Sequence, residues 1–217
     1  MRVNKYIALN FGVSRRTADS LVEQERVMVN GSRVRVGQDV TDLDIVEVDG
    51  YKKLDQKAPT ILLNKPMGYV CSRDGQGSQT VYDLLPETYR HLKIAGRLDK
   101  DSSGLVVLSN NGDLIQKLSH PSKGGQKIYQ VELDKPLSKQ AEAQVKLGVD
   151  IGDSRLSRMI ITGKGRAWEV KLSEGRNRQI RRTFDKLGYT VVSLHRTQLA
   201  GYNLVEIPLA GWKILTD

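Results

Sequence analysis

The segment 49–59, DGYKKLDQKAP, restricts the possible folds of this sequence more than any other feature. It is polar, its apolar residues follow neither a helical nor a strand period, and it ends with proline, as linkers do. It divides a chain of 217 residues into a small and a medium unit, each long enough to bury a core. We therefore expect a first module over residues 1–48, a linker over 49–59 and a larger domain over 60–217.

The first module is predicted to combine two short helices with a hairpin. Apolar residues recur at helical spacing up to Phe11, and Gly12 is placed to end that helix. Ser14 is placed to cap a second helix, in which small and apolar residues again repeat at three and four. Asn30-Gly31 lies between two valine-rich runs and predicts a tight hairpin turn, followed by a closing strand over residues 44–48.

The larger domain alternates short β-type runs with helical stretches. This pattern favours an α+β fold built on a mixed, largely antiparallel sheet. A helix is expected after Asn177, which is placed to cap it, with Ile180, Phe184 and Leu187 on its buried face and Gly188 at its end. The runs expected as strands are 61–63, 105–109, 127–133, 168–172 and 191–194.

The charge of the chain indicates a polyanionic partner. It carries 34 basic and 25 acidic residues, a net charge of +9, with seven bases and three acids in residues 1–35 and five acids and no base in 36–49. The remaining 27 bases and 17 acids fall in 50–217, so both units have a basic part. Such a surplus favours binding to phosphates through counterion release.

Other features of the sequence argue against a membrane partner. No run approaches the roughly 18 apolar residues of a membrane helix, and no basic amphipathic helix with an aromatic face is evident. The N-terminus lacks the apolar run of a signal peptide, so we expect a cytoplasmic protein, and we expect it to be a monomer. The single cysteine, Cys71, is expected to be a buried small hydrophobe, and the three histidines show no metal-ligand spacing, so we expect neither metal nor cofactor.

Two segments of the larger domain carry the side chains that could take part in catalysis or in binding. The first, IAGRLDKDSSGLVVLS over 94–109, predicts a rigid loop that exposes Asp99 beside a strand. Asp99 and Asp101 could serve as the acid and nucleophile of a glycosidase, but carboxylates two residues apart in a loop are more often turn formers. The second, EGRNRQIRR over 174–182, has four arginines, which charge alone marks as a solvated or phosphate-binding face.

The first module resembles a known RNA-binding unit. Its pattern N-K-Y-I-A, G-V-S-R-R-x-A-D, R-V-x-V-N-G and V-G-x-x-V is similar to the alpha-L RNA-binding module of a ribosomal protein, tyrosyl-tRNA synthetases and RNA-modifying enzymes. In that family the basic second helix and the hairpin lie on RNA. The resemblance implies RNA contacts by Arg2, Lys5, Arg15, Arg16, Arg26 and Arg33.

The larger domain resembles the RsuA family of ribosomal pseudouridine synthases. It carries G-R-L-D-x-D-S/T-x-G-L, then K-x-Y, then E-G-R-x-x-Q-I/V-R/K-R, in the order of that family, with L-N-K-P-x-G ahead of them. The resemblance implies that Asp99 is the catalytic group, that Tyr129 lies against the target base and that Arg181 pairs with the catalytic carboxylate, while Asp101 is structural. It further implies RNA contacts by Arg97, Lys127, Arg176, Arg178, Arg182 and Lys65, the last being chiefly structural.

The resemblance implies an enzyme that isomerises a uridine in structured RNA, foremost ribosomal RNA. The forms K-D-S-S-G and N-R-Q-I-R-R favour the large-subunit RNA, and some relatives modify tRNA. A non-catalytic RNA-binding or ribosome-assembly factor would explain the charge and the first module equally well. A glycoside- or nucleoside-cleaving hydrolase would need an additional acid or an activated water, and the sequence offers no convincing pair of carboxylates.

Overall fold

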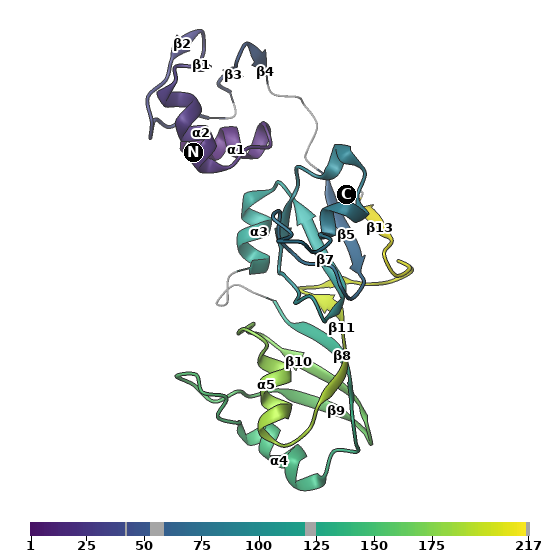
Figure 1. Cartoon of the computed structure of the whole chain (residues 1–217). Helices are drawn as coiled ribbons and strands as arrows, with labels where there is room; N and C mark the ends of the chain where they lie inside the picture. The colour runs from purple at the N-terminus through teal and green to yellow at the C-terminus, as the bar shows by residue number, and fades with distance from the viewer. Residues whose placement is uncertain (42, 53–58, 120–124, 216–217) are drawn as a thin grey trace.

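The computed structural model describes residues 1–41, 43–52, 59–119 and 125–215. The chain is elongated, with the N-terminal unit at one end and a larger domain whose two halves follow along the long axis (Figure 1). The N-terminal unit contains α1 (Val3–Asn10), α2 (Arg15–Glu23), β1 (Val27–Val29), β2 (Ser32–Arg33), β3 (Val46–Val48) and β4 (Tyr51–Lys52).

The two helices and the hairpin turn predicted for the N-terminal unit are found, and the closing strand is shorter than predicted, beginning at Val46. Gly12, with a φ of +74°, follows the end of α1, and the Ser14 hydroxyl accepts the backbone N–H of Thr17 at 2.9 Å to cap α2. Asn30 and Gly31 both have positive φ, 51° and 77°, which turns β1 back into β2. The antiparallel sheet has the order β2-β1-β3-β4, and valines from it pack against both helices.

The sheet of this unit extends into the segment predicted as a linker. Asp49 and Gly50 have φ values of 51° and 77°, as Asn30 and Gly31 do, so a second tight turn reverses the chain and pairs β4 with β3. Residues 53–58 of the predicted linker lie outside the described residues, as does His120. Residues 51–52 of the predicted linker therefore belong to the sheet of the N-terminal unit.

The larger domain is built on a nine-stranded sheet in which β13-β5-β7-β11-β8-β10-β9 are neighbours, β6 pairs with β7, and β12 pairs with β11. Its strands are β5 (Thr60–Lys65), β6 (Lys93–Ala95), β7 (Ser103–Ser109), β8 (Lys127–Leu133), β9 (Ile160–Lys164), β10 (Ala167–Leu172), β11 (Val191–Leu199), β12 (Tyr202–Asn203) and β13 (Trp212–Leu215). Its helices are η1 (Val81–Leu84), η2 (Glu87–Tyr89), α3 (Gly112–Ser119), α4 (Lys139–Leu147) and α5 (Gln179–Lys186).

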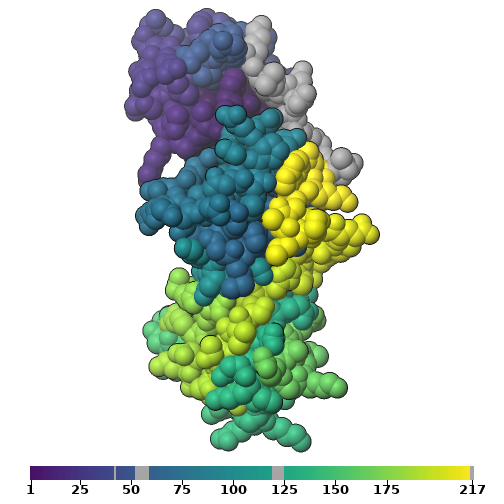
Figure 2. Space-filling view, turned by 45° about the vertical axis from the view of Figure 1, so that its right-hand side comes forward, coloured from purple at the N-terminus to yellow at the C-terminus, as the bar shows by residue number. Residues whose placement is uncertain are grey.

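One short parallel pairing joins the two halves of this sheet. β7 and β11 are parallel and pair only His195 with Ser103 and Arg196 with Gly104, whereas the other strand pairs are antiparallel. The first half holds β13, β5, β7 and β6, and the C-terminal segment lies against it, yellow beside blue in Figure 2. The second half holds β11, β8, β10 and β9 with α4 and α5 (Figure 1). The expected largely antiparallel α+β fold is confirmed.

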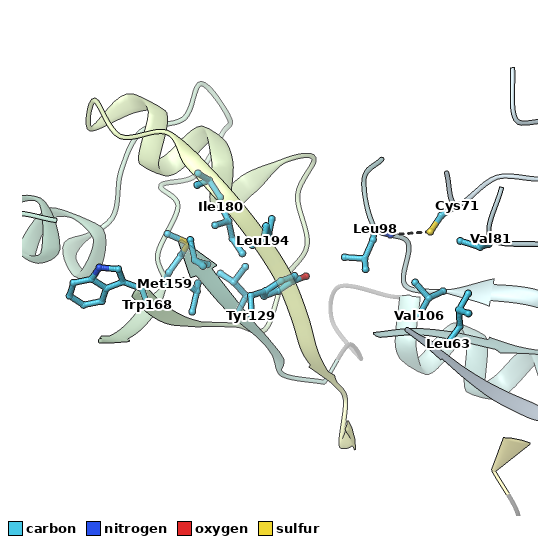
Figure 3. Close-up of a cluster of buried hydrophobic side chains, with 14 of the residues drawn as sticks. Leu63, Cys71, Val81, Leu98, Val106, Tyr129, Met159, Trp168, Ile180 and Leu194 are labelled. Carbon is cyan, nitrogen blue, oxygen red and sulfur yellow. Dashed lines mark hydrogen bonds between the residues drawn. The ribbon is translucent and has the colours of Figure 1, made fainter. Parts of the chain in front are cut away.

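The cores of the two halves follow from strand alternation. Ile61 and Leu63 of β5 face one core cluster, while Leu62 between them faces a second cluster that α3 covers. The larger cluster continues into the second half, where Tyr129, Ile180 and Leu194 belong to it (Figure 3). The site described below therefore lies between well-packed elements.

The start of α5 differs from the prediction. The residue before the helix is Arg178, in a left-handed conformation with a φ of 47°, and it makes no side-chain capping hydrogen bond. Asn177 is therefore not the N-cap, because the sharp turn at Arg178 adds one residue between it and the helix. The predicted buried face is confirmed at Ile180 and Phe184, and Gly188 ends the helix with a φ of 80°.

Candidate active site

A cleft of about 680 Å³ lies where the two halves of the sheet meet. This volume falls within the usual range for small-molecule and nucleoside sites. Side chains from both halves line it, among them Arg97, Asp99, Lys127, Tyr129, Arg178 and Arg196. The sequence-predicted Asp99 and Tyr129, 30 positions apart in the chain, thus share one cleft.

The loop that carries Asp99 joins β6 to β7 and is held by the segment that follows β5. The Lys100 carbonyl accepts the backbone N–H of Gly68 at 2.8 Å, and the Leu98 N–H donates to Sγ of Cys71 at 3.4 Å. The Lys65 ammonium donates to the Ser102 carbonyl at 2.6 Å. These bonds turn the loop carbonyls inward and leave the Asp99 side chain 39% exposed, facing the cleft.

Lys65 is enclosed by the protein, so the structure gives no support to the RNA contact that the resemblance implies for it. The residue is 0% exposed, and its ammonium donates to the carbonyls of Pro66 and Ser102. Burial lowers the pKa of Lys65. An ammonium enclosed in this way has no path to a phosphate.

Arg196 in β11 also holds this loop and was not identified from the sequence. It is 1% exposed, and its guanidinium donates to the carbonyls of Gly96 at 2.5 Å and of Leu105 at 2.7 and 2.9 Å. A weaker bond of 3.4 Å reaches the carbonyl of Arg97. The available signal was an arginine at an inward position of a strand, two residues after the buried Leu194.

Tyr129 forms part of the opposite wall of the cleft. It lies in the middle of β8 and is 8% exposed, with its ring among the core residues of the second half. Its phenol oxygen points toward the half that carries Leu98 (Figure 3). Lys127, two residues earlier on the same face of β8, also lines the cleft, and burial lowers its pKa.

The expected direct pair between Arg181 and Asp99 is not formed. Among the described residues, Nε of Arg181 lies 3.2 Å from Asp101, without the alignment of a hydrogen bond, and its terminal nitrogens donate to the carbonyls of Asp101 and Val191. Burial lowers the pKa of the Arg181 guanidinium, and the Asp101 carboxylate opposes that shift. Arg181 thus connects α5, β11 and the Asp99 loop and lies behind the cleft wall.

Arg178 takes the place expected of Arg181 beside the carboxylates. It forms a two-pronged pair with Asp101, at 2.9 and 2.8 Å, while its Nη1 lies 3.9 Å from Asp99. This pairing holds the pKa of Asp101 below its usual value. Asp101, for which a structural role was expected, is therefore also the carboxylate nearest to the guanidinium groups of Arg178 and Arg181.

Arg176 and Arg182, for which the resemblance implies RNA contacts, are paired within the protein. Both pair with Asp153, at 3.3 and 2.8 Å, and Arg176 is only 17% exposed. They also donate to backbone carbonyls of the segment between α4 and β9, including that of Arg155 at 2.6 Å. Their guanidinium groups hold this segment against α5. The pairing depends on Asp153, which lies more than 20 residues earlier in the chain.

The basic residues of the N-terminal unit are mostly exposed, and several of them pair with acids. Arg15 and Arg16 are exposed on α2 without a carboxylate partner among the described residues. Lys5 pairs across the two units with Asp113 of α3 at 2.7 Å, so in this conformation it faces the larger domain. The remaining pairs are Arg2 with Asp39, Arg26 with Asp49 and Arg33 with Glu25.

The cleft shows no arrangement that would hold a metal ion. In residues 1–41, 43–52, 59–119 and 125–215, no three His, Cys, Asp or Glu side chains are grouped for metal binding, and no helix is long and apolar enough to cross a membrane. Cys71 is buried, as predicted, and burial raises its thiol pKa. The side chains that line the cleft include one carboxylate, Asp99, and one phenol, Tyr129, beside several cations.

Comparison with known proteins identifies two regions of the chain. Residues 1–46 match the family model for the S4 domain, and residues 59–186 match the model for RNA pseudouridylate synthase. Dual-specificity RNA pseudouridine synthase RluF of Escherichia coli K12 is 35% identical over 221 residues, which cover 100% of this chain and 76% of that protein.

Two further similarities extend over nearly the whole of both proteins. Ribosomal small subunit pseudouridine synthase A of Escherichia coli K12 is 35% identical over 224 residues, covering 100% of this chain and 97% of the relative. A crystal structure described as pseudouridylate synthase has a TM-score of 0.72 and 29% identity, covering 100% of this chain and 96% of its own.

Proposed function

This chain belongs to the RNA pseudouridylate synthase family and carries an S4 domain, and we propose that it isomerises a uridine of ribosomal RNA with Asp99 as the catalytic group. The observation that carries the assignment is the cleft itself. An exposed carboxylate and a phenol, Asp99 and Tyr129, face the same hollow beside Arg97 and Arg178.

The reaction needs little beyond these groups. The C1′–N1 bond of uridine breaks, the uracil turns, and a C1′–C5 bond forms at the same sugar carbon. N1 takes up a proton and C5 releases one, so no electrons and no other atoms are exchanged with a cofactor. A single carboxylate can attack the sugar, attack the ring or remove a sugar proton, and each route needs it aimed at the nucleoside, as the pinned loop holds Asp99.

The target base has to leave its stack before it reaches Asp99. Unstacking costs a few kcal/mol, and an aromatic wall such as Tyr129 can replace part of the lost stacking. Arg97, exposed at the rim, and Lys127 on the wall provide positive charge for the adjacent phosphates. The exposed Arg15 and Arg16 of the S4 domain supply further RNA contacts in this proposal.

Ribosomal RNA is the proposed substrate because one relative is named for the ribosomal small subunit and another for dual-specificity RNA modification. Within ribosomal RNA we place the target in the large subunit, on the forms K-D-S-S-G and N-R-Q-I-R-R. We further propose that the protein works as a cytoplasmic monomer, with 1–48 and 60–217 as its RNA-binding and catalytic units. Mapping pseudouridine in ribosomal RNA from cells with and without the gene tests the target.

The decisive assay is release of tritium from RNA that carries uridine labelled at C5. Wild-type protein should release tritium while the RNA chain stays intact and no free uracil appears. A binding or assembly factor would release none, and a nucleoside hydrolase would liberate uracil. Asp99→Asn should abolish release and bind RNA as wild type does, because the amide keeps the shape and removes the charge. Turnover by this variant would exclude Asp99.

A matched variant on α5 controls for loss of a carboxylate. Asp185 is exposed on α5, and no side-chain partner is found for it among the described residues. Asp185→Asn should therefore keep wild-type turnover. Tyr129→Phe keeps the aromatic wall and should retain most RNA affinity, whereas Tyr129→Leu should lower the rate because stacking of the extruded base is lost. Equal rates for Tyr129→Leu and wild type would remove Tyr129 from the site.

A further inference from the structure

A second hollow, of about 580 Å³, lies beside the cleft and has no role in the proposed reaction. The end of α4, the segment between α4 and β9, and the strands β9 and β10 form it. Leu172 lines both hollows, so they share a wall, and the loop 173–176 forms the ridge between them. We call this second hollow the basic groove; its basic residues are Lys146, Arg155, Arg158 and Lys171.

The side chains that line the basic groove carry a surplus of positive charge. Glu174 is the only acid among its lining residues, and its carboxylate already accepts hydrogen bonds from Arg176 at 3.0 Å and Gln179 at 2.6 Å. Lys146 and Lys171 have neighbouring glutamates at 2.7 and 3.1 Å, which form surface pairs of small energy. The groove therefore presents cations that a polyanion can bind.

Arg155 and Arg158 are held in place without being neutralised. Both are exposed, and neither has a carboxylate partner among the described residues. The carbonyl of Arg155 is fixed by Arg176, and Nε of Arg158 donates to the Leu147 carbonyl at 3.2 Å, which leaves its terminal nitrogens for a ligand. Arg176 and Arg182 thus position the segment between α4 and β9. That segment carries Arg155 and Arg158, which have no carboxylate partner among the described residues.

The remaining surface of the groove is aliphatic. Leu156 is 48% and Ile160 63% exposed, and the groove has no aromatic side chain among its lining residues. Without an aromatic platform the groove does not favour base stacking, whereas cations beside aliphatic surface suit phosphates and riboses. Contacts of that kind add affinity without reading the sequence.

We propose that the basic groove binds the RNA backbone on one side of the target uridine, as a continuation of the cleft. The proposal rests on the proposed function, because the RNA reaches the groove by extending from a nucleotide held at Asp99. It assigns to Arg155 and Arg158 a role in binding flanking nucleotides and none in the chemical step.

The test uses the full-length double variant Arg155→Gln, Arg158→Gln. Its matched control is Lys139→Gln, Lys186→Gln, which removes the same charge from exposed residues that line neither hollow. RNA affinity is measured against salt concentration with a stem-loop that extends on both sides of the target. Single-turnover tritium release is measured at saturating RNA.

We expect the groove variant to bind the extended RNA about tenfold more weakly than the control variant. The slope of the logarithm of its binding constant against the logarithm of the salt concentration should be smaller by roughly 1.5, because two phosphate contacts are lost. The saturating rate should equal that of wild type. On RNA trimmed to the target loop, the two variants should bind alike.

Equal affinity of the two variants for the extended RNA would overturn the proposal, and so would a lower saturating rate with unchanged affinity. In the second case Arg155 or Arg158 would serve the chemical step. Absence of tritium release from wild-type protein would refute the proposed function instead, so the two failures are distinguishable.

Discussion

Asp101→Asn tests how the two arginines are held beside the proposed catalytic loop. The amide keeps the size of the carboxylate and removes its charge, which two guanidinium groups share in the wild type. The Asp101 carbonyl, which accepts from Arg181 at 2.7 Å, is unchanged. The loop should therefore keep its position while the electrostatic attachment of α5 weakens.

The structure sets the size of the effect. The side chains of Arg178 and Asp101 are 43% and 40% exposed. Because solvent screens the pair, it should contribute about 0.5 kcal/mol to the free energy of unfolding. Arg181 is 13% exposed, and losing its Coulombic partner should cost about 1 kcal/mol. Together the two effects should lower the free energy of unfolding by about 1.5 kcal/mol, which corresponds to a decrease in Tm of roughly 3 to 6 °C for a chain of this length.

Activity should fall more than stability alone accounts for. Once Asp101 is neutral, the remaining carboxylate near Arg178 is that of Asp99, 3.9 Å from Nη1. Arg178 should move toward Asp99 and hold the proposed catalytic carboxylate back from the nucleoside. We expect kcat to fall about tenfold, or roughly 1.4 kcal/mol, with RNA affinity nearly unchanged.

The pH dependence identifies the cause. Hydrogen bonding to Arg178 lowers the folded-state pKa of Asp101, so its contribution is present above the unfolded value of about 3.9 and is lost as pH falls through the folded value. The stability difference between wild type and Asp101→Asn should be constant from about pH 7 to 5 and shrink below about pH 4. Thermal unfolding and single-turnover assays, with Asp185→Asn as control, measure both effects. Unchanged kcat, or a stability difference that grows in acid, would refute this reasoning.

Three further predictions concern the junction of β7 and β11. Burial lowers the pKa of His195, whose Nδ1 lies 2.9 Å from the Ser103 hydroxyl, so the unfolded state binds the proton more readily than the folded state. The wild type should therefore lose stability relative to His195→Gln as the pH falls below about 6.5. Denaturant unfolding of both proteins at pH 7 and pH 5 measures this difference. Gly104→Ala would place a Cβ 2.3 Å from the Arg196 carbonyl oxygen at a φ of +109°, and should destabilise by about 3 kcal/mol or more, measured the same way. Arg196→Met leaves buried carbonyls without donors and should lower soluble yield and Tm, unlike the exposed Arg97→Met, whose Tm should stay at the wild-type value.

Local sequence signals predicted local structure well. The Ser14 cap, the Asn30-Gly31 turn and the whole of β8 depend on neighbouring residues and periodicity, and each is found as predicted. β6 and β9 were not among the expected strands. In β9 only Ile161 is buried, and the run ends in Thr-Gly-Lys, so its sequence lacks the alternation of a half-buried strand. Chain-local patterns do not reveal a strand that is stabilised mainly by its neighbours.

The arginine partners could not be predicted in the same way. Four arginines within seven residues, 176–182, have similar sequence environments, yet two bind Asp153, one binds Asp101, and Arg181 bonds mainly to carbonyls. Which acid each meets depends on the loop after α4 and on the turn at Arg178, both set by tertiary packing. The motif thus predicted the location of the guanidinium groups and not their individual roles.

The two buried cations near Asp99 have a common physical reason. A loop that presents a carboxylate to a cleft turns several of its own carbonyls inward, and buried carbonyls need donors. Lys65 and Arg196 supply them with charge-assisted bonds, and neither has a carboxylate partner among the described residues. Neutral donors could satisfy the same carbonyls, but Arg196, which lines the cleft, also adds positive charge to the cleft wall, where an RNA phosphate is favoured. Arg196 therefore both holds the loop and favours the substrate class that we propose, whereas the enclosed Lys65 serves the loop alone.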